Sequence, residues 1–296
     1  MKPRHKVLVC VMLSQLAMSA AAADCEPVAI VSELHGSATV TERGKAQRGL
    51  QVYDWLTEGA SITVANGSNV VLVLASGARF SLKEHARVAV RRTGLRTSSA
   101  VQALPPLPPL PVVAPIASAA GGARRDPASP TISGAIRIRG PSIRNLYPSG
   151  HATIADNTTL RFDGPRGVTA YLVSVEDEKR STILELQTER EDLMVPPDAL
   201  EPGRRYTWRV TVVGDSVALP ARGTFVTLSA LTAKSRSALR SSLRGDQPGH
   251  LILLARIDER LGLLMEARDA LAAAVAQSPE NPRARQMLAG IEKQLQ

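Results

Sequence analysis

Histidine and cysteine are the residue types that most often carry catalysis or bind metal ions, and this chain has few of either. The histidines His35, His85, His151 and His250 lie far apart and have no second ligand at metal-binding spacing. Cys25 has no basic neighbour that would favour its thiolate. The chain also lacks a G-x-S-x-G elbow, a phosphate-binding glycine-rich loop and an H-E-x-x-H motif. We therefore predict a protein that is not an enzyme and has no catalytic, cofactor or metal site.

Other polar and aromatic clusters have simpler structural interpretations. The acidic residues 176–178 are followed by two basic residues, which is typical of a solvated hairpin tip, and a divalent-cation site is the alternative. Arg91, Arg92 and Arg96 follow a predicted strand, where they indicate a charged exit from a domain or, alternatively, docking to an anionic envelope surface. Trp55 and Trp208 lie within alternating patterns, which favours packing over ligand binding.

Composition limits the class of protein. The 296 residues include 36 Lys and Arg against 27 Asp and Glu, which gives a net charge of +9. This excess is spread along the chain and forms no basic stripe of the kind that binds nucleic acid, so we expect no nucleic-acid partner. Aromatic residues make up only 3%, so the cores must be aliphatic. The length predicts two or three domains.

The first 23 residues have the three-part layout of a secretory signal peptide. Basic residues open this segment, an apolar run from Val7 to Met18 follows, and three alanines end it at Ala23. The apolar run is too short to cross a bilayer core of about 30 Å as a helix. We therefore predict cleavage near Ala23, a periplasmic or secreted mature protein, and no integral membrane segment after cleavage.

Cleavage would leave Cys25 as the only cysteine, so no internal disulfide is expected. We do not expect lipid anchoring at Cys25, because Asp24 precedes it where bacterial lipoprotein signals have a small neutral residue. A free thiol or an intermolecular disulfide remains open.

A proline-rich segment divides the chain. Residues 104–132 contain eight prolines among alanine, serine and glycine, a composition that favours extended polyproline II and predicts a semi-rigid spacer. Its PxxP spacing at Pro105 and Pro108 would suit a peptide-binding domain as the alternative. The spacer separates a predicted domain over residues 24–103 from a second over residues 133–228.

The region before the spacer is predicted to be all-β. Short apolar runs between residues 28 and 92 are separated by turn residues. Asn66-Gly67 lies between two such runs, over 61–64 and 69–74, and predicts a hairpin because both residues accept positive φ at low cost.

The same region resembles the FecR domain. The resemblance is carried by Leu50, residues 55–60, 62–63, 67–68, 70–74, 76–77 and 88–90. It implies a FecR-like β domain over residues 24–103, with two departures from the family. Ser76-Gly77 stands where the family has Asp-Gly, and the cytoplasmic segment and membrane helix of FecR regulators of sigma factors are missing. The resemblance therefore implies signalling only together with a separate membrane protein.

Residues 133–228 also alternate as strands. The stretch 200–210, which contains Pro202-Gly203 and Tyr206, resembles the turn and tyrosine corner of a fibronectin type III or immunoglobulin-like β-sandwich. In that motif the tyrosine hydroxyl hydrogen-bonds back onto the turn. About 95 residues suit one such domain.

The period becomes helical after residue 229. Residues 248–281 resemble one tetratricopeptide (TPR) repeat of about 34 residues, with further helices predicted over 232–243 and 282–295. Spacings of three and four place one set of residues on a common helical face. This candidate protein-binding face, expected to be mostly structural, consists of Leu251, Leu254, Ala255, Asp258, Ala267, Leu271 and Ala274. The predicted fold is thus multi-domain, with two all-β modules followed by a C-terminal α-helical TPR-like unit over residues 229–296.

These modules favour one function and leave two alternatives. The leading hypothesis is a non-enzymatic binding or scaffold protein of the cell envelope whose partners are envelope proteins or peptidoglycan. The first alternative is the periplasmic component of a FecR-type signal-transduction pathway that acts with a separate membrane protein. The second is an enzyme or sugar-binding module whose site is built from loops, which β-sandwiches host without a sequence motif. The partner, the oligomeric state and the arrangement of the domains do not follow from the sequence.

Overall fold

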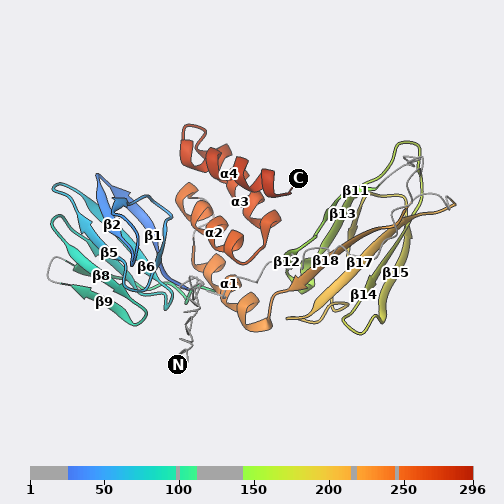
Figure 1. Ribbon diagram of the computed structural model, residues 1–296, viewed down its shortest axis with the longest axis horizontal. Coiled ribbons are helices and arrows are strands. Elements are labelled where there is room, and N and C mark those ends of the chain that lie inside the picture. Colours follow the sequence, from blue (N-terminus) through green and yellow to red (C-terminus); the bar gives the residue numbers. More distant parts are fainter. Residues whose placement is uncertain (1–25, 98–100, 112–142, 215–218, 244–246, 296) are drawn as a thin grey trace, which may run out of the picture.

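The computed structural model describes residues 26–97, 101–111, 143–214, 219–243 and 247–295. Ten strands, then eight strands, then four helices follow one another in these ranges. The helices stand between the two β regions (Figure 1). Within the described ranges no helix is both long and apolar enough to cross a membrane. The predicted signal peptide, Cys25 and most of the predicted spacer lie outside the described residues.

The first β region is a sandwich of two five-stranded sheets, ordered β10-β7-β6-β1-β4 and β3-β2-β5-β8-β9. The strands are β1 (Pro27–His35), β2 (Ala38–Thr41), β3 (Arg48–Gly49), β4 (Trp55–Thr57), β5 (Ser61–Val64), β6 (Asn69–Leu74), β7 (Arg79–Leu82), β8 (Arg87–Arg91), β9 (Gly94–Thr97) and β10 (Val101–Leu104). Alternating apolar and polar residues along the strands form the apolar core between the two sheets. Ile62 and Val64 of β5 point inward while Ser61 and Thr63 are exposed, as expected of a strand with one solvated face.

Strand β6 is buried on both faces. Val70, Leu72 and Leu74 belong to the core between the two sheets, whereas Val73 packs in a different cluster that includes the helices. Successive side chains of a strand point to opposite faces. The first sheet therefore lies between the second sheet and the helical unit.

The predicted hairpin at Asn66-Gly67 is not formed. Strand β5 pairs with β2 and β8, and β6 pairs with β1 and β7, so the turn crosses from one sheet to the other. Gly67 does adopt positive φ, at 65°. The turn at Asn66-Gly67 was predicted correctly, but the predicted pairing of β5 with β6 was wrong. Strand β6 is buried on both faces and β5 on only one, so the two strands belong to different sheets.

The first residues of the predicted spacer are bound to the first sandwich, which corrects the prediction of a spacer that begins at residue 104. Leu107 N–H donates to the Gly77 carbonyl and Leu110 N–H to the Ala75 carbonyl, both at 2.9 Å. A Cβ at position 77 would lie 2.1 Å from the Leu107 carbonyl oxygen, so only glycine allows this approach. The side chain of Leu110 is buried, and its packing attaches residues 105–110 to the fold.

The second β region is a sandwich of a three-stranded sheet, β11-β13-β16, and a five-stranded sheet, β12-β18-β17-β14-β15. Its elements are β11 (Arg144–Tyr147), β12 (His151–Thr153), a 3-10 turn (Ala155–Asn157), β13 (Thr159–Asp163), β14 (Tyr171–Glu176), β15 (Thr182–Thr188), β16 (Asp192–Met194), β17 (Arg205–Val212) and β18 (Ala221–Thr227). Trp208 and Phe225 are fully buried between the two sheets. The expected β-sandwich architecture is confirmed for this region.

The predicted tyrosine corner is formed. The hydroxyl of Tyr206, at the start of β17, accepts a hydrogen bond of 2.7 Å from the backbone N–H of Glu201. Gly203 in the intervening turn has φ of 76°, which glycine adopts without strain. The corner closes the turn before β17.

The helices begin and end at residues that suit these positions. They are α1 (Ala230–Ser242), α2 (Pro248–Arg260), α3 (Leu264–Gln277) and α4 (Pro282–Leu295). Ser229 caps α1, with its hydroxyl accepting from Thr232 N–H at 3.2 Å. The Asn281 side chain accepts from two N–H groups of the first turn of α4, both at 3.1 Å. Gly262, with φ of 77°, ends α2.

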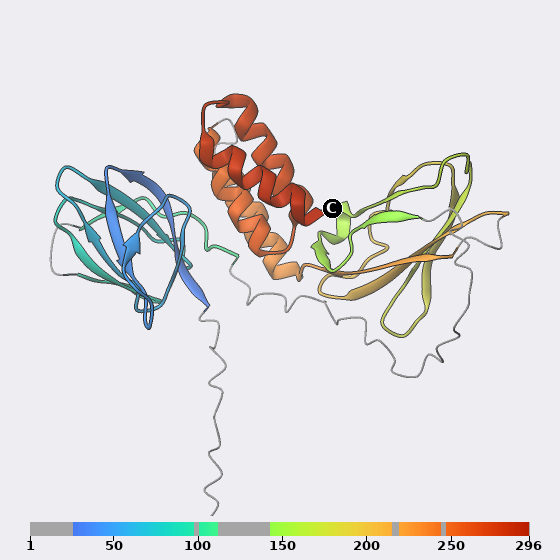
Figure 2. The same ribbon diagram turned by 45° about the horizontal axis from the view of Figure 1, so that its top comes forward.

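One apolar cluster joins all three parts. It contains Ile30 and Val73 of the first sandwich, Ala152 and Leu228 at the end of the second, and the interior of the helical unit. The Gly262 carbonyl also accepts from Ala152 N–H at 3.1 Å. The view in Figure 2 shows the helices in the same position between the sandwiches. The helical unit therefore contains the apolar cluster that connects the two sandwiches.

Candidate functional site

The residues of the predicted binding face lie inside the helical unit. Leu254, Ala255, Asp258, Ala267, Leu271 and Ala274 are buried, and Leu251 is half-buried. Ala267, Leu271 and Ala274 of α3 belong to the same apolar cluster as Leu254 and Ala255 of α2. Small side chains there let the two helices approach closely. The structure therefore brings this set together mostly as packing between helices, and its Leu251, Leu254 and Asp258 also line a groove.

Asp258 forms a buried ion pair with Arg236 of α1. Arg236 Nε lies 2.5 Å from Asp258 Oδ1 and Nη2 lies 2.7 Å from Oδ2, and the two side chains are 6% and 1% exposed. Burial favours a lower pKa for Arg236, but the hydrogen bonds and charge of Asp258 outweigh it and raise that pKa. Burial raises the pKa of Asp258 against the same pairing. Two parallel donors satisfy both carboxylate oxygens, which fixes α1 on α2.

A groove runs between α1 and α3 above α2. Its volume is about 400 Å³, and its walls are Asn157, Arg236, Arg240, Leu243, His250, Leu251, Leu254, Asp258, Glu266, Asp269, Ala270 and Ala273. Leu251 and Ala273 lie equally far along the chain from the α2–α3 turn at Gly262, as do Leu254 and Ala270. Each helix therefore contributes side chains at successive levels of the groove, which is apolar at one end and ionic at the other.

The apolar end combines large and small side chains. Leu251 and Leu254 of α2 line this end together with Leu243 and His250, whereas α3 contributes Ala270 and Ala273. Ala273 is exposed and Ala270 is half-buried. Two methyl groups opposite two leucines leave space that a large apolar side chain from another molecule would fill.

The ionic end contains an unpaired acceptor. Glu266 lies at the level of Asp258, and its Oε2 atom is buried without a hydrogen-bond partner among the described residues. Burial raises the pKa of Glu266, and the negative charge of Asp258 adds to this shift. A buried polar atom without a partner costs free energy, so Glu266 is a functional candidate rather than a stabilising residue.

Glu266→Gln tests this electrostatic cost. The pKa of Glu266 is raised in the folded state, so protonation of this carboxyl stabilises the fold. This stabilisation is fully present below the unfolded pKa of about 4.3 and is lost as the pH rises through the folded pKa. We expect the variant to be more stable than the wild type at pH 7 and equal to it at pH 4. Urea denaturation at both pH values measures the difference. A stability gap that is the same at both values would contradict the assignment.

The groove continues toward both sandwiches. A cavity of about 400 Å³ shares Leu243 and His250 with it and reaches Glu33 and Arg79 of the first sandwich. A smaller one, of about 110 Å³, shares Glu266 and reaches the second sandwich. These three cavities, which share wall residues, are together called the trough.

Tyr147 closes the trough at the second sandwich. Its hydroxyl accepts from Met265 N–H at 3.4 Å, and its ring stacks on His151 at 5.8 Å. Burial raises the pKa of the Tyr147 hydroxyl, with the charge of Glu266 adding to the effect. The hydroxyl stays neutral at physiological pH and therefore acts as a hydrogen-bonding group.

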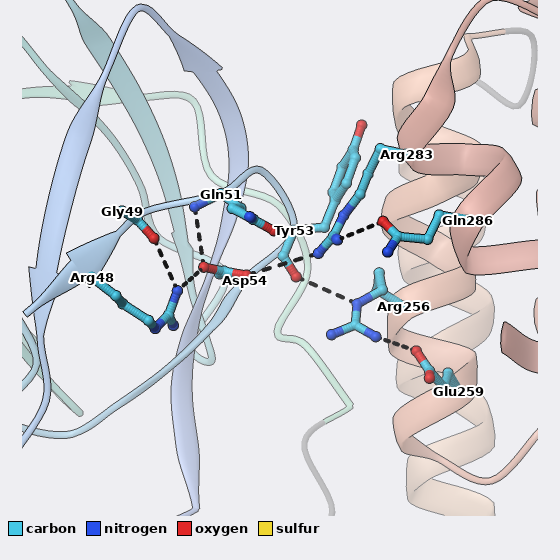
Figure 3. A network of polar contacts seen from close by, with 9 residues as sticks. All are labelled: Arg48, Gly49, Gln51, Tyr53, Asp54, Arg256, Glu259, Arg283 and Gln286. Atoms are coloured by element: carbon cyan, nitrogen blue, oxygen red, sulfur yellow. Dashed lines mark hydrogen bonds and ion pairs between the residues drawn. The ribbon is translucent and has the colours of Figure 1, made fainter. Parts of the chain in front are cut away.

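The side of α2 and α4 that faces the first sandwich is occupied by that sandwich (Figure 3). Arg256 Nε donates to the Tyr53 carbonyl and Tyr53 Oη to the Gly249 carbonyl, both at 3.4 Å. Arg283 Nη2 lies 4.0 Å from Asp54 Oδ1. Burial, with the charge of Glu33, raises the pKa of Tyr53 to about 12. The trough over α1, α2 and α3 is therefore an open face of the helical unit.

The remaining candidates from the sequence have structural surroundings. His35 and His85 are exposed at the first sandwich, and burial lowers the pKa of the half-buried His151. No group of three metal-binding side chains is present in the described parts of the chain. His250 lies in the trough, far from the other three histidines in sequence.

The acidic hairpin and the tryptophans also have packing roles. One oxygen of Asp177 accepts from the N–H groups of Lys179 and Ser181, both at 2.8 Å, which forms the turn. Trp208 is fully buried and donates to the Pro148 carbonyl at 2.8 Å. Trp55 is half-buried beneath Arg260, whose guanidinium lies 5.6 Å from the ring centre.

Sequence reasoning missed Arg236, Glu266 and the two groove alanines. The segment 270–274 contains four alanines, and only contact with α1 and α2 distinguishes those that face the groove. A weak signal was present for Arg236, because it lies three residues before Leu239 on the side of α1 that is buried.

No protein-family model matches this chain, and no curated protein does. The FecR-like and TPR-like resemblances therefore stay predictions. Among solved structures, the fn3 domain of human collagen alpha-1(XX) chain is 22% identical and covers 31% of this chain and 86% of its own, with a TM-score of 0.26. A cell surface anchoring domain is 18% identical and covers 23% and 88%, with a TM-score of 0.22.

The type-IX secretion-system surface component PorZ of Porphyromonas gingivalis is 10% identical and covers 64% of this chain and 25% of its own, with a TM-score of 0.22. Scores this low support no inference about ligands or assembly.

Proposed function

We propose that this chain is a non-enzymatic binding protein of the cell envelope that holds a segment of a partner protein in the groove between α1 and α3. The observation that carries the proposal is an open groove of about 400 Å³ with an apolar end and an ionic end on the helical unit. Grooves between stacked helices are used to bind extended or helical segments. The predicted signal peptide supports the envelope location.

The two sandwiches act as rigid flanks in this proposal. The first is a FecR-like domain and the second a fibronectin type III-like domain, and each contacts one end of the TPR-like helical unit. Tyr53 and Trp55 hold the first sandwich, and the hydrogen bond from Ala152 to Gly262 holds the second. Preorganised walls lower the conformational cost of binding a flexible segment.

Filling the groove from within tests the proposal. In Ala273→Leu the new side chain occupies the space opposite Leu251, so we expect partner affinity to fall by about tenfold or more, or about 1.4 kcal/mol. The stability should change little, because the position is exposed and leucine is a good helix former. Quantitative pull-down from envelope extract with the full-length protein measures the loss.

Ala272→Leu is the matched control. Ala272 is the exposed neighbour on α3 and is absent from the groove walls, so this variant should retain its partners. Deleting the helices would be a poor test, because their core is shared with Ile30 and Val73 of the first sandwich. Equal recovery of every partner by the wild type and Ala273→Leu would exclude the groove as the binding site.

A further inference from the structure

Among the described residues, Glu266 is the carboxylate at the ionic end of the groove that forms no ion pair, although Arg161 of the second sandwich lines the adjoining cavity with it. Arg236 and Asp258 neutralise each other through two hydrogen bonds, and Asp269 is paired with Arg268 at 2.6 Å. Glu266 keeps one buried oxygen that has no partner in the described ranges. The groove therefore lacks one hydrogen-bond donor at this end.

Arg240, the other positive side chain of α1 in the groove, does not supply this donor. Arg240 is exposed at the rim, one helical turn away from Arg236 and level with Leu254 and Ala270. An acidic ligand side chain at the ionic end would face the unpaired carboxylate of Glu266. Ion pairs at an exposed rim contribute little, whereas a half-buried carboxylate gains strongly from a cationic donor, so the complementary charge is positive.

We propose that the groove selects a segment that presents a large apolar side chain to Ala270 and Ala273 and a lysine or arginine side chain to Glu266. This specificity rests on the proposed function and adds the class of partner to it. The apolar side chain fills the space opposite Leu251 and Leu254, and its cationic neighbour donates to the carboxylate of Glu266. The partner is thus a basic, apolar-anchored segment of a protein.

Short synthetic peptides test this specificity with the full-length, isotope-labelled protein. Each peptide has one leucine or phenylalanine in a Gly-Ser background, with one lysine at a series of spacings on either side. Matched sets carry glutamine or glutamate instead of lysine. Lysine amide acetylated at its α-amino group (acetyl-lysine amide), whose side chain keeps its positive charge, represents a free cation. Chemical-shift changes at the amides of Ala270 and Ala273 report binding, and titration gives the affinity.

We expect the best lysine peptide to bind about tenfold more tightly than its glutamine counterpart, as a charge-assisted hydrogen bond gives, and the glutamate peptide to bind most weakly. Glu266→Gln should reduce the lysine peptide to the affinity of the glutamine peptide. Ala273→Leu should abolish binding of all three peptides, and Ala272→Leu should leave it intact.

The outcomes separate the two proposals. If apolar peptides bind in the groove but lysine, glutamine and glutamate peptides do so equally, the basic specificity is wrong and the proposed function stands. If acetyl-lysine amide binds as tightly as the peptides, the ligand is a small cation and the segment proposal is wrong. If no peptide binds, or Ala273→Leu binds them as the wild type does, both proposals are wrong.

Discussion

Replacing Asp258 by alanine is expected to destabilise the folded chain by about 3–5 kcal/mol, because Arg236 would keep its charge in the core without a partner. The Arg236 side chain is only 6% exposed, so water cannot replace the two lost hydrogen bonds without opening the helical unit. Because the apolar cluster of this unit includes residues of both sandwiches, we expect the loss to lower the cooperativity of unfolding as well. Urea denaturation followed by far-ultraviolet circular dichroism measures it.

A double variant separates the cost of an unpaired charge from the contribution of the ion pair. Arg236→Met combined with Asp258→Leu replaces both charges by apolar side chains of similar size. We expect this variant to recover most of the stability lost in Asp258→Ala, since a buried ion pair often contributes no more than apolar packing. If Asp258→Ala loses less than about 1 kcal/mol, or the double variant is the less stable of the two, the account of this pair is wrong.

Trp208→Ala is the second substitution with a large expected effect. Trp208 is fully buried between the sheets of the second sandwich, and its indole N–H donates to the Pro148 carbonyl at 2.8 Å. Truncation to alanine removes the largest buried side chain of this sandwich and leaves a cavity, so we expect a loss of about 3–5 kcal/mol. A Cβ on Gly223 would lie 2.4 Å from the indole nitrogen, which indicates how tightly the ring is enclosed.

Two milder substitutions serve as controls for Trp208. Trp208→Phe keeps most of the apolar volume and loses the hydrogen bond, so it should cost about 1–3 kcal/mol for the Pro148 carbonyl left without its donor. Leu172→Ala changes a 36% exposed side chain on β14, and we expect about 0.5 kcal/mol. Both Trp208 variants leave Trp55 as the only tryptophan, so fluorescence would not report on the second sandwich in them. Calorimetry is therefore the measurement for all three variants. Equal losses for all three variants would contradict the packing role of the indole.

The candidate site shows where sequence reasoning succeeds and where it ends. Spacing of three and four placed Asp258 among the inward residues of α2, and the structure has it there. Its partner Arg236 lies 22 residues earlier on another helix, and no local pattern connects the two. Glu266 has the same limitation, because its carboxylate is buried only by the arrangement of α1, α2 and the second sandwich around it.

The first sandwich shows a similar division. The apolar runs identified its strands, and Asn66-Gly67 identified a turn. The partners of β5 and β6 could not be predicted, because pairing depends on which faces distant elements cover. The proline-rich composition predicted an extended chain after residue 104, but not that Leu107 and Leu110 would hydrogen-bond to the turn at Gly77.

The sequence by itself determined the features that depend on near neighbours. These are the helices with their caps at Ser229 and Asn281, the strand alternation and the tyrosine corner at Tyr206. Only the tertiary structure decided which surface is open, because burial depends on residues far apart in the chain. Part of the face predicted for binding packs between α2 and α3, whereas its Leu251, Leu254 and Asp258 line the candidate groove together with Ala273 and Glu266.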